Sequence, residues 1–84
     1  MTYRTEFSSS ARRQLKELPS DIQLEIREAV NSLSTAPRPM GVARMSGEDA
    51  YRIRVRDYRV VYEIYDEVLI VIVVAVGHRR EVYR

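Results

Sequence analysis

The sequence contains no cysteine and a single histidine, His78. Without cysteine there is no disulfide framework, no thiolate metal site and no cysteine nucleophile, and one histidine argues against a zinc site. The three glycines lie far apart, at positions 41, 47 and 77, so no glycine-rich phosphate loop exists. Composition does not exclude a serine–histidine–aspartate site, but the sequence lacks the nucleophile-elbow pattern. We therefore expect neither a cofactor nor a metal.

Long hydrophobic runs are also absent. The longest, "VLIVIVVAV" at positions 68–76, spans 9 residues, far short of the roughly 20 that a membrane helix needs. The first residues, "MTYRTEFSSS", have no apolar core of signal-peptide length. A chain of 84 residues is enough for one domain. We expect a single domain, residues 1–84, that is soluble and cytoplasmic and contacts no membrane.

Lysine is nearly missing, because 13 of the 14 basic residues are arginine and the other is Lys16. Residues 1–50 carry 7 basic and 7 acidic groups, whereas residues 51–84 carry 7 basic and 5 acidic groups. The net charge of +2 therefore belongs to the second half. Arginine offers a planar, permanently charged fork that suits phosphate and stacks on bases. An arginine-rich host proteome would produce the same skew, so composition alone does not decide between the two.

The pattern along the chain predicts an α+β fold with the order β-α-α-β-β-β. Alternation predicts a strand in "TYRTEF", and the serines after it supply N-cap candidates. Apolar residues at helical spacing predict two helices separated by Pro19 and Ser20, hence an αα-hairpin. Ser20 and Gln23 would form the capping box of the second helix. A 15-residue loop precedes three strands, "YRIRVR", "YRVVYEIY" and "VLIVIVVAV". We expect a small antiparallel sheet with the helical hairpin packed on one face.

Strand alternation gives the first functional indication. In "YRIRVR", Arg52, Arg54 and Arg56 project from one face about 6.8 Å apart, twice the strand rise, which is close to the phosphate spacing of an extended nucleic-acid strand. Arg59 would lie on the same side of the next strand, but whether it joins the others depends on the register, which the sequence does not fix. The alternative is a solvated polar face on an antiparallel sheet.

A second cluster, "GHRREVYR", follows the most apolar strand directly. His78 has a side chain that titrates near neutral pH when unperturbed, and surrounding guanidinium groups would favour the ionised phenol of Tyr83. Arg79 and Arg80 cannot act as acid or base, but they can stabilise the extra negative charge of a pentacoordinate phosphate. Such a set is sufficient for metal-free RNA cleavage by the 2′-hydroxyl. Equally, His78 can be an idle rim residue, and Tyr83 can pin the C-terminus to the sheet.

The element order, "YRIRVRDYRVVY" and "VGHRREVY" together resemble the RelE/ParE superfamily of toxins from bacterial and archaeal toxin–antitoxin pairs, over nearly the whole chain. The resemblance implies a single RelE-like toxin domain. RelE-type members cut mRNA in the ribosomal A site, and ParE-type members poison DNA gyrase. The family's active positions match five residues of this sequence, namely Arg52, Arg54, Arg59, Arg79 and Tyr83. Relatives often have lysine at the first two positions, and arginine is a far poorer base than lysine.

The resemblance thus implies a ribosome-dependent, metal-independent mRNA endoribonuclease that a cognate antitoxin neutralises in a hetero-oligomer. Its catalytic residues would be Arg59, Arg79, Tyr83 and, as a general acid, His78. The residues that bind RNA or the ribosome would be Arg52, Arg54, Arg56 and Arg80. Two alternatives stay open: a ParE-like toxin that inhibits gyrase and cuts nothing, and a non-toxic module that binds an antitoxin.

Overall fold

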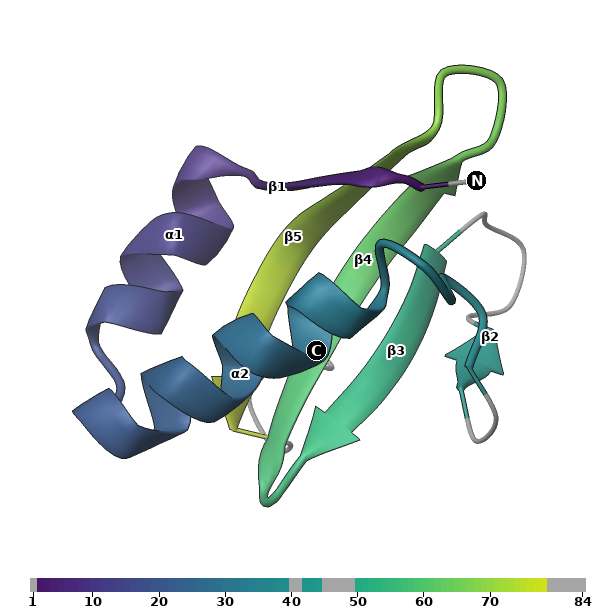
Figure 1. The fold of residues 1–84 in the computed structure, drawn as a ribbon. Coiled ribbons are helices and arrows are strands. Elements are labelled where there is room, and N and C mark those ends of the chain that lie inside the picture. The colour runs from purple at the N-terminus through teal and green to yellow at the C-terminus, as the bar shows by residue number, and fades with distance from the viewer. Residues whose placement is uncertain (1, 40–41, 45–49, 79–84) are drawn as a thin grey trace.

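The structure, a computed structural model, describes residues 2–39, 42–44 and 50–78. Two helices lie together on one face of a single curved sheet (Figure 1). The elements in chain order are β1 (Arg4–Phe7), α1 (Ser9–Lys16), α2 (Ser20–Ser32), β2 (Ala43–Arg44), β3 (Ala50–Val55), β4 (Tyr58–Tyr65) and β5 (Ile70–His78). The predicted α+β class and the order β-α-α-β-β-β are confirmed, with the two-residue β2 added inside the segment expected to be a loop.

Helix α1 begins where the serine run predicts. Ser8 is the N-cap, and its hydroxyl accepts a hydrogen bond from the backbone N–H of Ala11 at 3.1 Å, which satisfies one of the free donors of the first turn. Ala11 and Leu15 form the buried stripe of the helix. The basic residues Arg13 and Lys16 lie in its last turn. Their positive charges there interact favourably with the negative end of the helix dipole.

The start of α2 differs from the expected capping box. Its N-cap is Pro19, which offers no side-chain acceptor, and Ser20 is already helical. Gln23 instead points back across the turn, and its amide donates to the carbonyl oxygen of Leu18 at 2.8 Å. The glutamine therefore ties the two helices together at their junction. The αα-hairpin itself is confirmed, because a short connection joins the two helices and both lie on one face of the sheet (Figure 1).

The sheet is mixed, in the order β1-β5-β4-β3-β2. The β3–β4 and β4–β5 pairs are antiparallel, as expected, and the additional β2–β3 pair is antiparallel too. In contrast, β1 runs parallel to β5, with Arg4 opposite Ile70 and Phe7 opposite Val73. Tight turns force their flanking strands to be antiparallel, whereas β1 is joined to the rest of the sheet through two helices, and so long a connection permits parallel pairing. The expectation of a wholly antiparallel sheet is therefore corrected for this one edge strand.

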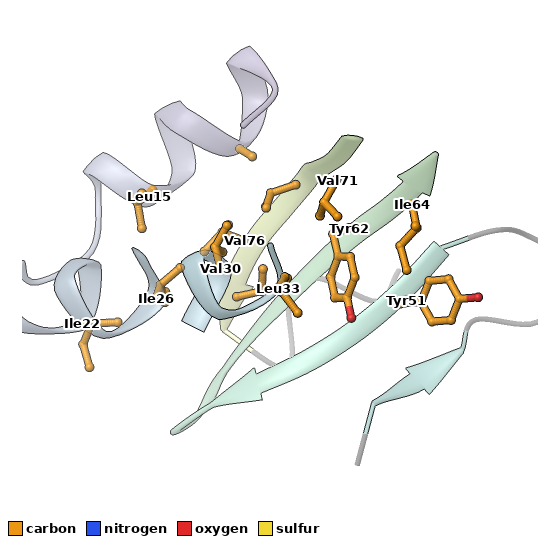
Figure 2. Close-up of a cluster of buried hydrophobic side chains, with 13 residues drawn as sticks. Leu15, Ile22, Ile26, Val30, Leu33, Tyr51, Tyr62, Ile64, Val71 and Val76 are labelled. Carbon is orange, nitrogen blue, oxygen red and sulfur yellow. The ribbon is translucent and has the colours of Figure 1, made fainter. Parts of the chain in front are cut away.

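A hydrophobic core fills the space between the helices and the sheet (Figure 2). Leu15, Ile22, Ile26 and Val30 descend from the helices onto Val71, Val76 and Tyr62 of the central strands, and all are buried. The Tyr62 hydroxyl donates to the backbone carbonyl of Pro37 at 2.7 Å, and burial raises its pKa to about 12. Within the described parts of the chain, no helix is long and apolar enough to cross a membrane.

A polar clasp, made of Tyr3, Arg38, Tyr51 and Asp66, closes the end of the sheet at the β4–β5 turn. Two nitrogens of Arg38 donate to the Asp66 carboxylate at 3.2 and 2.9 Å, and the Tyr3 hydroxyl donates to it at 2.6 Å. Arg38 Nε also donates to the Tyr51 hydroxyl at 3.1 Å. The clasp thereby fastens the segment after α2 to β3 and to the β4–β5 turn, at the end of the sheet remote from His78.

Candidate functional site: an arginine cluster on the open face of the sheet

The strand register gathers three arginines on the face of the sheet that carries no helix. Arg54 lies directly opposite Arg59, and Arg52 lies opposite Val61, two pairs further along the same two strands. Opposite residues in an antiparallel pair share a face, with Cβ atoms about 5 Å apart. Arg52, Arg54 and Arg59 therefore form one group, which we call the arginine cluster. The sequence had left the membership of Arg59 undecided, and the register decides it.

Strand β5 provides the other border of the cluster. Arg59 pairs with Gly77 on β5, so the neighbouring position on that side has no side chain. Arg54 is exposed, whereas Arg52 and Arg59 are partly buried, and the Nε atom of Arg59 is buried. The cluster therefore combines one accessible guanidinium with two that are held against the sheet. Such an arrangement presents positive charge to a ligand at fixed positions.

Directly opposed like charges work against the stability of a sheet. The Arg54–Arg59 pair occupies such a position, where an oppositely charged or β-branched pair would stabilise the two strands. Local choices that oppose folding tend to concentrate at functional sites. An anion-binding role would account for this unfavourable pair. An array of guanidinium forks suits phosphate groups in particular.

Arg56 does not belong to this surface. It lies in the β3–β4 turn with φ of 55°, where the strand alternation that would have placed it beside Arg54 has ended. Its Nε donates to Glu25 of α2 at 3.0 Å, and a second nitrogen contacts the other carboxylate oxygen. The expectation that Arg56 continues the row of arginines is wrong, because the turn directs its side chain to the helical side.

His78 likewise lies apart from the cluster. It pairs with Tyr58 at the end of β5, one residue beyond Gly77 and hence on the face that the helices cover. The two rings meet edge to face with their centroids 5.9 Å apart. Both residues line a cavity of about 430 Å³ between α1 and the strand end. The sheet thus separates His78 from Arg54 and Arg59, and the structure does not bring the expected general acid together with them.

The remaining predicted site residues, Arg79, Arg80 and Tyr83, lie outside the described residues. Their catalytic and RNA-binding roles therefore stay predictions. The structure describes the chain up to His78, and these residues follow it directly in the sequence. Among residues 2–39, 42–44 and 50–78, no group of three or more histidine and carboxylate side chains is arranged to hold a metal ion.

One structural neighbour of the site was not anticipated from the sequence. Gln14 of α1 reaches the end of β5, where its Oε1 accepts a hydrogen bond from the backbone N–H of Val76 at 2.8 Å. Nothing in the local sequence signals this contact, because it depends on where β1 ends and on how α1 then lies along β5. Only the three-dimensional pairing of strands reveals it.

Comparison with known proteins agrees with this architecture. The family model for the ParE toxin of type II toxin–antitoxin systems matches residues 5–83. The mRNA interferase toxin RelE of Escherichia coli K12 is 30% identical, with 99% of this chain and 92% of that protein aligned. The toxin RelG of Mycobacterium tuberculosis is 35% identical, with 100% of this chain and 99% of that protein aligned.

A solved structure gives the same answer for the fold. The toxin–antitoxin complex RelBE2 from Mycobacterium tuberculosis contains a chain that superposes with a TM-score of 0.84 at 30% identity, covering 96% of this chain and 95% of that one. The matched length, the mixed sheet with its helical hairpin and the family model all point the same way. This chain belongs to the RelE/ParE superfamily, the toxins of type II toxin–antitoxin systems.

Proposed function

We propose that this protein is the toxin of a type II toxin–antitoxin system and that it cleaves mRNA in the A site of the ribosome. The observation that carries the proposal is the register of β3 and β4, which sets Arg54 opposite Arg59 with Arg52 beside them. The relatives named as mRNA interferases support the same activity. The arginine cluster would hold the phosphate groups of the mRNA, and the protein would act in the cytoplasm, where ribosomes translate.

The chemistry that suits this surface is attack by the RNA itself. The 2′-oxygen of a ribose forms a bond to the adjacent phosphorus, and the bond from phosphorus to the 5′-oxygen of the next nucleotide breaks. The products are a 2′,3′-cyclic phosphate and a 5′-hydroxyl. The pentacoordinate transition state carries extra negative charge. The guanidinium groups of Arg59 and Arg79 would stabilise that charge.

The two proton transfers need other groups, because an arginine does not lose its proton in proteins. Tyr83 is our candidate to orient the 2′-hydroxyl, to stack on a base or to remove the proton. Arg52 and Arg54 would position the substrate backbone, and Arg80 would add charge beside it. The ribosome would supply the alignment of the reacting atoms, a contribution that lowers the barrier greatly in intramolecular reactions.

The partner that restrains the toxin would be a cognate antitoxin. The relative of known structure was solved as a toxin–antitoxin complex, which supports a hetero-oligomer here. A segment that covers the arginine cluster would prevent access of mRNA to it. Acidic, disordered segments that fold on contact are suited to such a role, because they wrap large surfaces and complement positive charge.

The experiment that tests the proposal is mRNA 3′-end mapping in a translating extract with purified wild-type protein and Arg59→Ala. Removing one donor that faces a developing oxyanion typically costs about 10²–10³ in rate, so Arg59→Ala should lose nearly all cleavage. Arg27→Ala is the matched control, because Arg27 is exposed on α2. It should cleave like wild type. Codon-phased cleavage by folded Arg59→Ala at the wild-type rate would refute the assignment of that residue.

A ParE-like activity is the second candidate, and the name of the matching family model favours it. A gyrase inhibitor would arrest growth without producing new mRNA ends, and its toxicity would not require the arginine cluster. Gyrase supercoiling assays with the same two variants separate the candidates. Inhibition that is equal for wild type and Arg59→Ala, together with intact mRNA in the extract, would replace the nuclease proposal with the gyrase one.

A further inference from the structure

The last part of β5 lacks a strand neighbour on its β1 side among the described residues. The parallel pairing of β1 with β5 ends where Phe7 meets Val73, and the chain then turns into α1. Residues 74–78 continue past that point, with β4 along their other side. This strand end presents Gly77 opposite Arg59 and leads directly into residues 79–84. Its position therefore matters to the proposed site.

Two side chains from the start of the chain take the place of the missing strand. The Ser8 hydroxyl approaches the carbonyl oxygen of Val74 at 3.5 Å, a long contact. Gln14 makes the stronger one, since its Oε1 lies 2.8 Å from the backbone nitrogen of Val76. Gln14 is exposed as a residue, yet its amide group reaches inward to a backbone donor 62 positions away in the sequence.

Packing does not replace this hydrogen bond. A cavity of about 430 Å³ separates α1 from the strand end, and it is lined by Gln14, Glu17, Leu18, Tyr58 and residues 75–78. Side chains that face a cavity of this size lose close contacts on that side. The Val76 side chain itself is buried in the core, so the Gln14 amide holds the end of β5 at the rim of this cavity.

We infer that Gln14 is a positioning residue for mRNA cleavage, acting through Val76 to fix the end of β5 beside Arg59. The inference rests on the proposed nuclease function and extends it to a residue that touches no substrate. Reactions that depend on alignment lose rate when a supporting element shifts by about 1 Å. Loss of the Gln14 tether should therefore lower the rate of the cleavage step, whereas ribosome binding through the exposed arginine face should persist.

The test compares Gln14→Met, which keeps the length of the side chain but removes the acceptor, with Gln14→Glu, which keeps an acceptor oxygen. We measure the maximal cleavage rate on ribosomes paused at one codon, the half-saturating ribosome concentration, and the amide exchange of Val76, Gly77 and His78. For Gln14→Met we expect about a tenfold lower maximal rate and about tenfold faster Val76 exchange, the size of effect typical of one lost hydrogen bond. The half-saturating ribosome concentration should not change. Gln14→Glu should restore the maximal cleavage rate and the slow exchange of the Val76 amide.

Gln23→Met is the matched control, because it removes a glutamine whose amide ties α1 to α2 through the carbonyl oxygens of Lys16 and Leu18. It should lower the thermal midpoint without changing the maximal cleavage rate. An equal rate loss in Gln23→Met, or failure of Gln14→Glu to restore the rate, would overturn the inference. If the wild-type protein cleaves no mRNA on ribosomes, the proposed function fails, and the exchange of the Val76 amide then shows separately whether Gln14 holds the strand end.

Discussion

At the scale of single residues, the protein keeps positive charges in positions that cost stability. Arg54 and Arg59 face each other across β3 and β4, whereas Arg56, the neighbour in sequence, is neutralised by Glu25. Under the proposed function, Arg54 and Arg59 are the charges that the RNA would contact, whereas Arg56 lies on the helical side of the sheet.

Replacement of Arg54 by threonine should therefore stabilise the protein and lower its activity together. Threonine suits a strand, and removal of one of two directly opposed charges should raise stability by about 0.2–1 kcal/mol. Urea unfolding at low ionic strength measures the change, and the gain should shrink as salt screens the charges. A destabilised Arg54→Thr, or a variant with full cleavage activity, would contradict this account.

Asp66 should make the stability of the protein depend on acidic pH. Hydrogen bonds from Arg38 and Tyr3 hold the pKa of its carboxyl below the usual range, and a lowered pKa in the folded state stabilises that state once the carboxyl is ionised. This contribution is complete above the ordinary pKa of an aspartate and is lost as pH falls through the lowered value. Unfolding midpoints at neutral pH and near pH 3 should thus differ less in Asp66→Asn than in wild type. Identical acid sensitivity in both proteins would show that the clasp does not contribute.

At the scale of elements, α1 serves the sheet as well as the core. Its cap residue Ser8 also donates its backbone N–H to the Val73 carbonyl at 2.9 Å, so the helix starts while the chain is still bonded to β5. One turn and a half later, Gln14 returns to the same strand. The helix is therefore aligned along β5 by hydrogen bonds at both of these points.

Ser8→Ala should lower the free energy of unfolding by about 1 kcal/mol, because it removes the acceptor for the Ala11 N–H at the first turn of the helix. Ser8→Thr should retain most of the stability, since threonine also caps helices. Chemical denaturation followed by circular dichroism measures both variants. A Ser8→Thr protein as unstable as Ser8→Ala would mean that the hydroxyl is not the relevant group.

At the scale of the whole molecule, the sequence predicted the helices and strands better than it predicted which strands pair with each other. The Ser8 cap and the helical hairpin followed from local sequence signals, and the structure confirms them. Partner choice is non-local, so the parallel β1–β5 pair was missed. The register that joins Arg59 to Arg54 could not be derived for the same reason. Arg56 was misplaced because two-residue periodicity was carried one position too far, into a turn.

A small domain with one exposed arginine surface should cut free RNA poorly. The cluster can hold phosphate groups, but a ligand held on one side only is not aligned for in-line attack, and alignment is a large part of the rate. We expect slow, weakly selective cleavage of naked RNA and rapid cleavage of the same message on ribosomes. Efficient cutting of naked RNA, measured with a chelator and with magnesium in parallel, would contradict the dependence on the ribosome.

The place of β5 between β1 and β4 has a consequence for the time at which the toxin becomes active. This strand is bonded both to β1, near the start of the sequence, and to β4, which precedes it, yet synthesis runs from the N-terminus and produces β5 after the other described strands. Contacts between such distant segments form slowly, typically in milliseconds to seconds. A nascent chain that ends before Ile70 lacks the strand that joins β1 to β4, and it carries helices without a complete sheet beneath them. The surface that would attack a ribosome is therefore assembled only after β5 has left the ribosome that made it.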